Sequence, residues 1–141
     1  MDRQRDEGAV TDGESTWEDL WKRLNDFFGV LVDELRACNE GLGSLPWHHQ
    51  TTAFPFTGGV SLCKVAPSFD EDLVLTWSVA WREDRLIVTA DVARGDGMVL
   101  AEAVPAELPL LVSRSKLFAE LDRAMRFFRS SMDLIKREVC E

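Results

Sequence analysis

The chain has 141 residues, of which 45% are hydrophobic and 29% are charged, and its formal net charge is −9. This length suits a single domain that buries a core without a metal or a disulfide. The acidic balance argues against a nucleic-acid-binding protein, because a phosphate backbone is bound mainly through Lys and Arg.

Several features of the sequence predict a cytoplasmic protein. The first residues are polar and do not resemble a secretory signal, and no apolar run is long enough to cross a membrane. Cys38, Cys63 and Cys140 are odd in number and far apart, which predicts reduced thiols, with Cys140 the more reactive, rather than a disulfide framework. Arginine outnumbers lysine twelve to four, which suggests a bacterium with a GC-rich genome.

The first predicted element is a helix. Residues 1–14 lack apolar periodicity and predict a flexible tail, which leaves 15–141 as the single domain. Ser15 and Glu18 match a capping box, a common start of a helix. The glycines in GLG at 41–43 predict its end. Between these points the apolar residues recur at helical spacing on one face: Trp17, Leu20, Trp21, Leu24, Phe27, Phe28, Leu31, Val32, Leu35 and Cys38.

The stretch LPWHHQTTAFPF, at 45–56, follows the helix and holds both histidines of the chain. We expect it to cross to the first strand as a lid on the core, with Trp47 and the two phenylalanines turned inward. Gly58-Gly59 is interpreted as a turn. The first strand is then expected to begin near Val60.

Two further strands are predicted at 73–82 and 85–93, because large apolar residues alternate with small or polar ones in both. A turn between them pairs Trp81 with Leu86 and places the large apolar residues on one side. The sequence RGDG at 94–97 predicts a second hairpin turn.

The segment 98–110 predicts a long edge strand, where its two prolines are tolerated. A second helix is expected from Ser113 or Ser115 to the end of the chain. The predicted fold is therefore α+β: an N-terminal helix, a meander of about four antiparallel strands and a long C-terminal helix, arranged as a two-layer sandwich with both helices on one sheet face.

The other sheet face would be small and semi-polar, neither a good core nor a strongly solvated surface. Phe127 and Leu134 fall outside the apolar stripe of the last helix. Together these features predict a contact surface for a second subunit or another protein. The residues expected to bind the partner are Phe127, Leu134, Ile87, Thr89, Asp91, Asp70, Glu71 and Asp72.

The candidate chemistry is sparse. His48 and His49 are adjacent, and successive side chains of an extended chain point to opposite sides; a zinc site also needs three or four ligands. Ser113 and Lys116 match the S-x-x-K spacing of some serine hydrolases, but a serine at the start of a helix is expected as an N-cap. We therefore expect no catalytic residue, no metal and no cofactor.

The segments LVLTWSVAWREDRLIVTADVA and AEAVPAELPLLVSRSKLFAELDRAMRFFRSSMDLI resemble the second half of the type III secretion chaperone-like and YbjN-like domains, in which antiparallel strands lead into a long closing helix. The resemblance covers about 70–138. It implies a small acidic dimer that binds a segment of another protein, and no catalytic residues.

Two classes of function follow from the sequence. The favoured one is a non-enzymatic interaction protein, chaperone-like or an adaptor, or else a toxin-neutralising immunity protein; its partner would be another protein of basic charge, and a homodimer is expected. The alternative is a regulatory domain that binds a small molecule or a metal near Trp47, His48 and His49.

Overall fold

The computed structural model describes residues 14–49, 56–65 and 71–140. The predicted tail falls almost wholly outside this range. The elements, in chain order, are α2 (Glu14–Arg36), β1 (Gly43–His49), β2 (Phe56–Cys63), β3 (Leu73–Arg82), β4 (Arg85–Arg94), β5 (Val99–Glu102), β6 (Ala106–Pro109), α3 (Arg114–Ser130) and α4 (Met132–Cys140).

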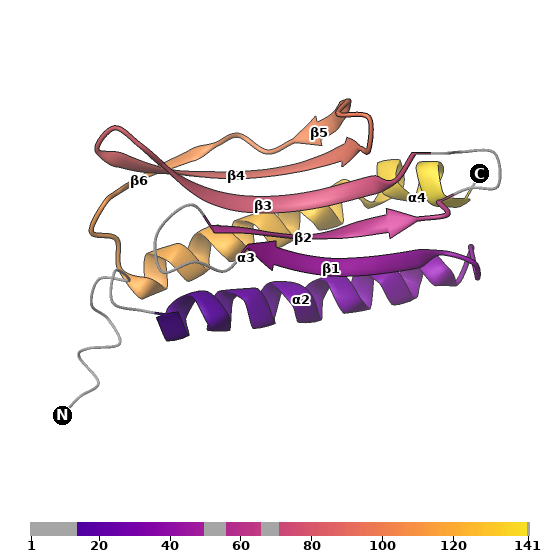
Figure 1. The fold of residues 1–141 in the computed structure, drawn as a ribbon, viewed down its shortest axis with the longest axis horizontal. Helices are drawn as coiled ribbons and strands as arrows, with labels where there is room; N and C mark the ends of the chain where they lie inside the picture. The colour runs from indigo at the N-terminus through magenta and orange to yellow at the C-terminus, as the bar shows by residue number, and fades with distance from the viewer. Residues whose placement is uncertain (1–13, 50–55, 66–70, 141) are drawn as a thin grey trace.

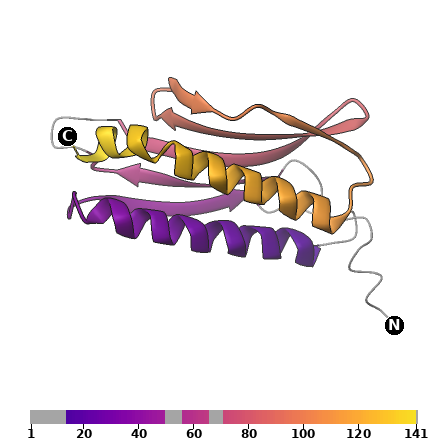
Figure 2. The ribbon, with the colours of Figure 1, turned by 180° about the vertical axis from the view of Figure 1, so that it is seen from behind.

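The α+β class and the meander are confirmed. The strands form one antiparallel sheet in the order β1-β2-β3-β4-β5, and β6 also pairs with β4. The helices lie together on one side of this sheet (Figures 1 and 2). The core lies between the two layers, where Phe28 of α2, Phe128 of α3 and Trp77 of β3 are almost completely buried.

The prediction of about four strands was wrong, because the described part of the chain contains six. The expected edge strand 98–110 is interrupted at 103–105, where Pro105 lacks an N–H, so that β5 and β6 pair with β4 as separate strands. The other additional strand is β1, which includes much of the expected lid. Pro46 pairs with Val60 there, and an edge strand tolerates proline because the missing N–H faces away from the ladder.

The predicted turn at Gly58-Gly59 is also wrong, since both glycines lie inside β2. A β-carbon on Gly58 would come within 2.9 Å of Leu24 on α2, so glycine permits the close approach of the helix. On the opposite side of the sheet, the ring of Trp47 covers Gly59. The two glycines thus accommodate bulky groups on opposite faces of the same strand.

The register of the β3–β4 hairpin is as predicted. Trp81 pairs with Leu86 and Trp77 with Ala90, and the residues of β3 alternate between buried and half-buried up to Ala80. At the end of the hairpin this rule fails, because the Trp81 side chain is 57% exposed despite its place in the apolar series.

The last helix is interrupted at Ser131, between α3 and α4, rather than continuous. Its predicted cap is confirmed: the Ser113 hydroxyl oxygen accepts a hydrogen bond from the backbone N–H of Lys116 at 3.2 Å. This bond gives the S-x-x-K spacing a structural role as a helix cap.

The prediction of reduced thiols was wrong for two of the three cysteines. Cys38, just after α2, and Cys140, at the end of α4, form a disulfide with a Cα–Cα distance of 5.6 Å, within the range that disulfides require. The two helices run in the same direction along the sheet, so their C-terminal ends lie at the same end of the molecule (Figure 1). Cys63 is the free thiol and is half-buried.

Candidate functional site

The outer face of the sheet, which points away from the helices, is the candidate site. On β3, Leu73, Leu75, Trp77 and Val79 are buried toward the helices, and the residues between them point the other way. The register between strands arranges these outward residues in rows across the sheet.

The first of these rows, here called the apolar row, consists of Leu45, Ser61, Val74, Ala93 and Val99. Its two ends are conspicuously uncovered, because the Leu45 side chain is 66% exposed and that of Val99 is 51% exposed. The middle of the row is built from small residues. The row is therefore a shallow strip that offers apolar area to a contacting surface.

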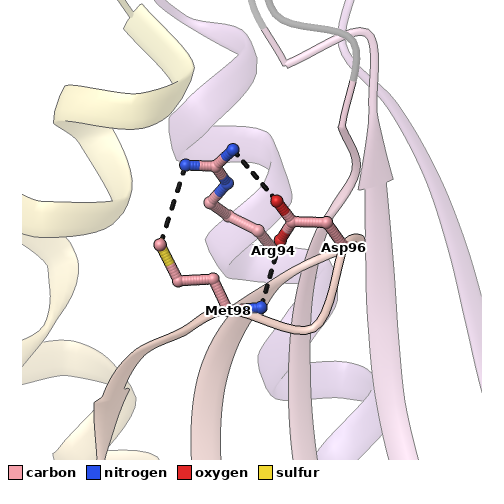
Figure 3. A network of polar contacts seen from close by, with 3 residues as sticks. All are labelled: Arg94, Asp96 and Met98. Carbon is pink, nitrogen blue, oxygen red and sulfur yellow. Dashed lines mark hydrogen bonds and ion pairs between the residues drawn. The ribbon is translucent and has the colours of Figure 1, made fainter.

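The turn between β4 and β5 holds one end of the apolar row in place (Figure 3). The Asp96 carboxylate accepts a hydrogen bond from the backbone N–H of Met98 at 3.0 Å and pairs with the Arg94 guanidinium at 3.2 Å. Gly97 adopts a φ of +95°, a conformation that glycine takes without strain. The predicted Asp-Gly turn is thus present, and it leads directly into Val99.

The neighbouring row, here called the acidic row, consists of Trp47, Gly59, Thr76, Asp91 and Glu102. Asp91 and Glu102 are direct neighbours across the β4–β5 ladder. Partial burial, and then the negative charge of Glu102, raise the pKa of Asp91 above its ordinary value of 3.8. Two carboxylates at one ladder position repel each other.

We expect the substitution Asp91→Asn to stabilise the fold at pH 7 by about 0.5 kcal/mol. The pKa of Asp91 is raised in the folded state, so ionisation of this carboxyl group opposes folding above that pKa. The penalty, and with it the gain from the substitution, disappears as the pH falls through the raised pKa toward 3.8.

Urea denaturation of the parent and the variant at pH 7 and pH 4 measures both effects. Asp84→Asn, at the exposed turn between β3 and β4, is the matched control and should change little. A variant that is less stable than the parent at pH 7 would contradict the repulsion between Asp91 and Glu102.

The sheet residues among the predicted partner-binding residues share the outer face. Thr89 is a cross-strand neighbour of Ser78, and their hydroxyl groups are 2.8 Å apart. Ile87 lies opposite Glu107 of β6. Asp91 belongs to the acidic row.

The described part of the predicted acidic run lies along one side of the apolar row. The Asp72 carboxylate accepts a hydrogen bond from the Ser61 hydroxyl at 3.3 Å, which places it beside that row. Glu71 precedes it and is half-buried. Asp70 lies outside the described residues.

The helical members of the predicted surface lie elsewhere. Phe127 is on α3, half-buried, with its ring 5.2 Å from that of Phe128. Leu134 is half-buried on α4. The helices α3 and α4 lie on the side of the sheet opposite its outer face (Figure 2), so the sheet separates Phe127 and Leu134 from the outward residues of β4. The structure does not bring these two groups into one surface.

The side chains around the two histidines also alternate between the two faces of the sheet. The expectation that Trp47 turns inward was wrong, because this side chain lies on the outer face over Gly59. His48 points to the helix side and stacks on Trp21 at a ring distance of 4.5 Å. The backbone of His49 lies in β1, and its side chain is outside the described part of the structure. Among the described residues, no group of three or more His, Cys, Asp or Glu could hold a metal ion.

A cavity of about 260 Å³ lies between α2 and the first two strands. Its apolar wall includes Phe28, Val32 and Val60, and Arg36 contributes a polar group. Neither Trp47 nor His48 lines it. The residues expected to bind a small molecule therefore do not share this space.

Sequence reasoning missed Leu45, Val99 and Glu102 as members of the candidate site. The available signal was the alternation of residues 43–49 about Pro46, which is compatible with an edge strand. For Val99 and Glu102, the signal was their position after a strongly predicted hairpin turn.

Comparison of the chain with protein-family models, with curated proteins and with solved structures finds no significant match. The resemblance to type III secretion chaperone-like and YbjN-like domains therefore stays a prediction. In the described ranges, no helix has the length and apolar character needed to cross a membrane.

Proposed function

We propose that this domain is a non-enzymatic protein-interaction module, chaperone-like or an adaptor, that binds a segment of another protein through the outer face of its sheet. The observation that carries the proposal is the apolar row, which lies uncovered between acidic groups on a face that no described element covers.

The physical support begins with exposed apolar area. Leu45 and Val99 are both more than half exposed and lie at opposite ends of one row. Contact with a partner would remove this area from water, at a gain of roughly 25 cal/mol for each Å². The small residues between them leave the strip shallow enough for the backbone of a partner to approach.

The edges of the sheet are less suited to binding than its face. An added strand needs a continuous series of N–H donors on the edge that it joins. Pro46 interrupts this series on β1, and Pro105 and Pro109 interrupt it on the opposite edge. This arrangement favours contact with the outer face over strand addition.

The paired hydroxyl groups of Ser78 and Thr89 on the outer face support a binding role for this part of the face rather than a catalytic one. The Ser78 and Thr89 hydroxyls are 2.8 Å apart and hydrogen-bond to each other. A nucleophilic hydroxyl needs an adjacent general base, and the partner of each is another hydroxyl.

The proposal is tested by identifying a partner through co-purification from the native organism and then measuring its affinity for variants. The double variant Leu45→Asp, Val99→Asp should weaken binding by about a hundredfold, since a few anchoring side chains carry most of the energy of an interface. The matched control is Val30→Asp, Leu111→Asp, which changes two exposed apolar residues outside the sheet face. It should bind as the parent does.

All four positions are more than half exposed, so the variants should fold, and thermal melting checks this. Equal affinity of the parent and the Leu45→Asp, Val99→Asp protein would overturn the proposal. The identity of the partner separates the two forms of the hypothesis: a toxin domain indicates an immunity protein, and any other client indicates a chaperone or adaptor.

A further inference from the structure

We propose that the apolar row is covered by a different protein that carries an apolar strip flanked by Lys or Arg, and not by a second copy of this chain. This inference rests on the proposed function of the outer face and specifies the chemistry of its partner.

Apart from the Arg94–Asp96 ion pair in the β4–β5 turn, the charged groups beside the apolar row are carboxylates. Asp72 lies at one side of the row, through its contact with Ser61. Asp91 and Glu102 lie on the other side, in the acidic row. Neither row contains Lys or Arg. A strip of apolar side chains is therefore bordered on both sides by carboxylates.

These carboxylates differ from those of the helix layer. There, three acidic groups are paired between α2 and α3: Asp19 with Arg114 at 2.6 Å, Glu34 with Arg129 at 2.9 Å and Asp122 with Arg23 at 3.2 Å. Asp72, Asp91 and Glu102 form no ion pair with a Lys or Arg of the described chain. The raised pKa of Asp91 is consistent with this lack of a cationic neighbour.

The basic residues of the outer face lie at its other end. Arg82 and Arg85 are cross-strand neighbours at the end of the β3–β4 hairpin. Arg85 is already 3.8 Å from Glu107 of β6. At the acidic end, the guanidinium of Arg94 pairs with Asp96 and is not an ion-pair partner of Asp72, Asp91 or Glu102.

A second copy of the chain is a poor match for this surface. If the apolar rows of two copies covered each other, each would bring its flanking carboxylates against those of its partner. The second copy could instead be shifted along the strands until its Arg82 and Arg85 faced the acidic row of the first copy. The apolar row of each copy would then lie beyond the end of the other sheet and would not be covered. Like charges that face each other across an interface oppose association, so a cationic partner is favoured.

The test uses two synthetic peptides with the same central apolar residues, one flanked by lysines and one by glutamates. They are titrated into the full-length ¹⁵N-labelled protein. The lysine peptide should shift the amide signals of Val74, Ala93 and Val99, and added salt should weaken its binding. The glutamate peptide should leave these signals unchanged.

Charge reversal gives the second measurement. The variant Asp91→Lys, Glu102→Lys should lose affinity for the lysine peptide by at least about tenfold. The control variant Asp26→Lys, Asp33→Lys makes the same change in net charge on exposed positions of α2. It should bind the lysine peptide nearly as well as the parent does. Thermal melting checks that both variants fold.

Light scattering across a concentration series measures self-association. A monomer is expected from the charges of the outer face, in place of the homodimer that the sequence predicted. A dimer that the Leu45→Asp, Val99→Asp substitutions dissociate would overturn the inference, as would equal binding of the two peptides.

A native partner that binds through the apolar row but is insensitive to Asp91→Lys, Glu102→Lys would overturn this inference and leave the proposed function intact. A partner insensitive to Leu45→Asp, Val99→Asp would overturn the proposed function itself.

Discussion

Reduction of the Cys38–Cys140 disulfide is expected to lower the free energy of unfolding by about 2–4 kcal/mol. The bond joins residues 102 positions apart, so it removes many conformations from the unfolded chain. It also fastens α4, which buries only a few side chains, Met132, Ile135 and Val139, against the rest of the core. Urea denaturation with and without a thiol reductant measures the difference.

The variant Cys38→Ser should reproduce the effect of the reductant, and Cys63→Ser should melt as the parent does. Thiol titration of the unreduced, denatured parent should find one free thiol of the three cysteines in the sequence. The disulfide would be contradicted by three free thiols together with an unfolding curve that the reductant does not change.

The substitution Gly59→Ala is expected to destabilise the fold by about 3 kcal/mol, at the upper end of the usual cost of overpacking. The new methyl group would collide with the Leu75 carbonyl oxygen, which belongs to the backbone of the adjacent strand. It would also meet the Trp47 ring at 2.8 Å. A backbone oxygen in the middle of a sheet cannot move aside without disturbing the ladder.

Gly58→Ala is the matched control, because it places the same methyl group on the neighbouring residue. The atoms that it meets are the end of the Leu24 side chain at 2.9 Å and the Trp21 ring. Those side chains can shift, so we expect a smaller loss for Gly58→Ala in the same denaturation experiment. The reverse order of stabilities would refute the close contact between Gly59 and β3.

The sequence correctly predicted those parts of the fold in which a single pattern, such as the alternation of apolar residues, decides the structure. The β3–β4 hairpin was predicted in register because its apolar residues alternate without a break from Leu73 to Trp81. The strand β1 was missed because Pro46 is usually a sign against a strand, and because two adjacent histidines suggested a separate lid.

The reduced thiols were predicted from the number and spacing of the cysteines, and the four-strand plan would not have corrected that prediction. Apart from the connection between β5 and β6, each short connection from α2 to α3 reverses the direction of the chain. With four strands, the last helix would run opposite to the first, and Cys140 would lie at the far end of the molecule from Cys38. The strand β1 adds one reversal, while β5 and β6 run the same way along β4. The helices become parallel, and the two cysteines meet.

The outer face was predicted in part. The alternation of β3 and β4 placed Ile87, Thr89 and Asp91 on it correctly as neighbours. The helical residues were harder to place, because Phe127 and Leu134 fall outside the apolar stripe and the stripe alone does not say what the flank of the helix contacts. Phe127 and Leu134 therefore seemed compatible with the same surface, although they belong to the other layer.

The position of Trp47 over Gly59 has a practical consequence for spectroscopy. Trp17 and Trp77 are buried in the core, and Trp21 is stacked on His48. Trp47 is the tryptophan that lies on the outer face within the acidic row. Trp81, at the end of the β3–β4 hairpin, is also exposed, so a Trp81→Phe background isolates the signal of Trp47. In that background, the emission wavelength of Trp47 and its quenching by acrylamide should report occupancy of the outer face in real time, without a chemical label.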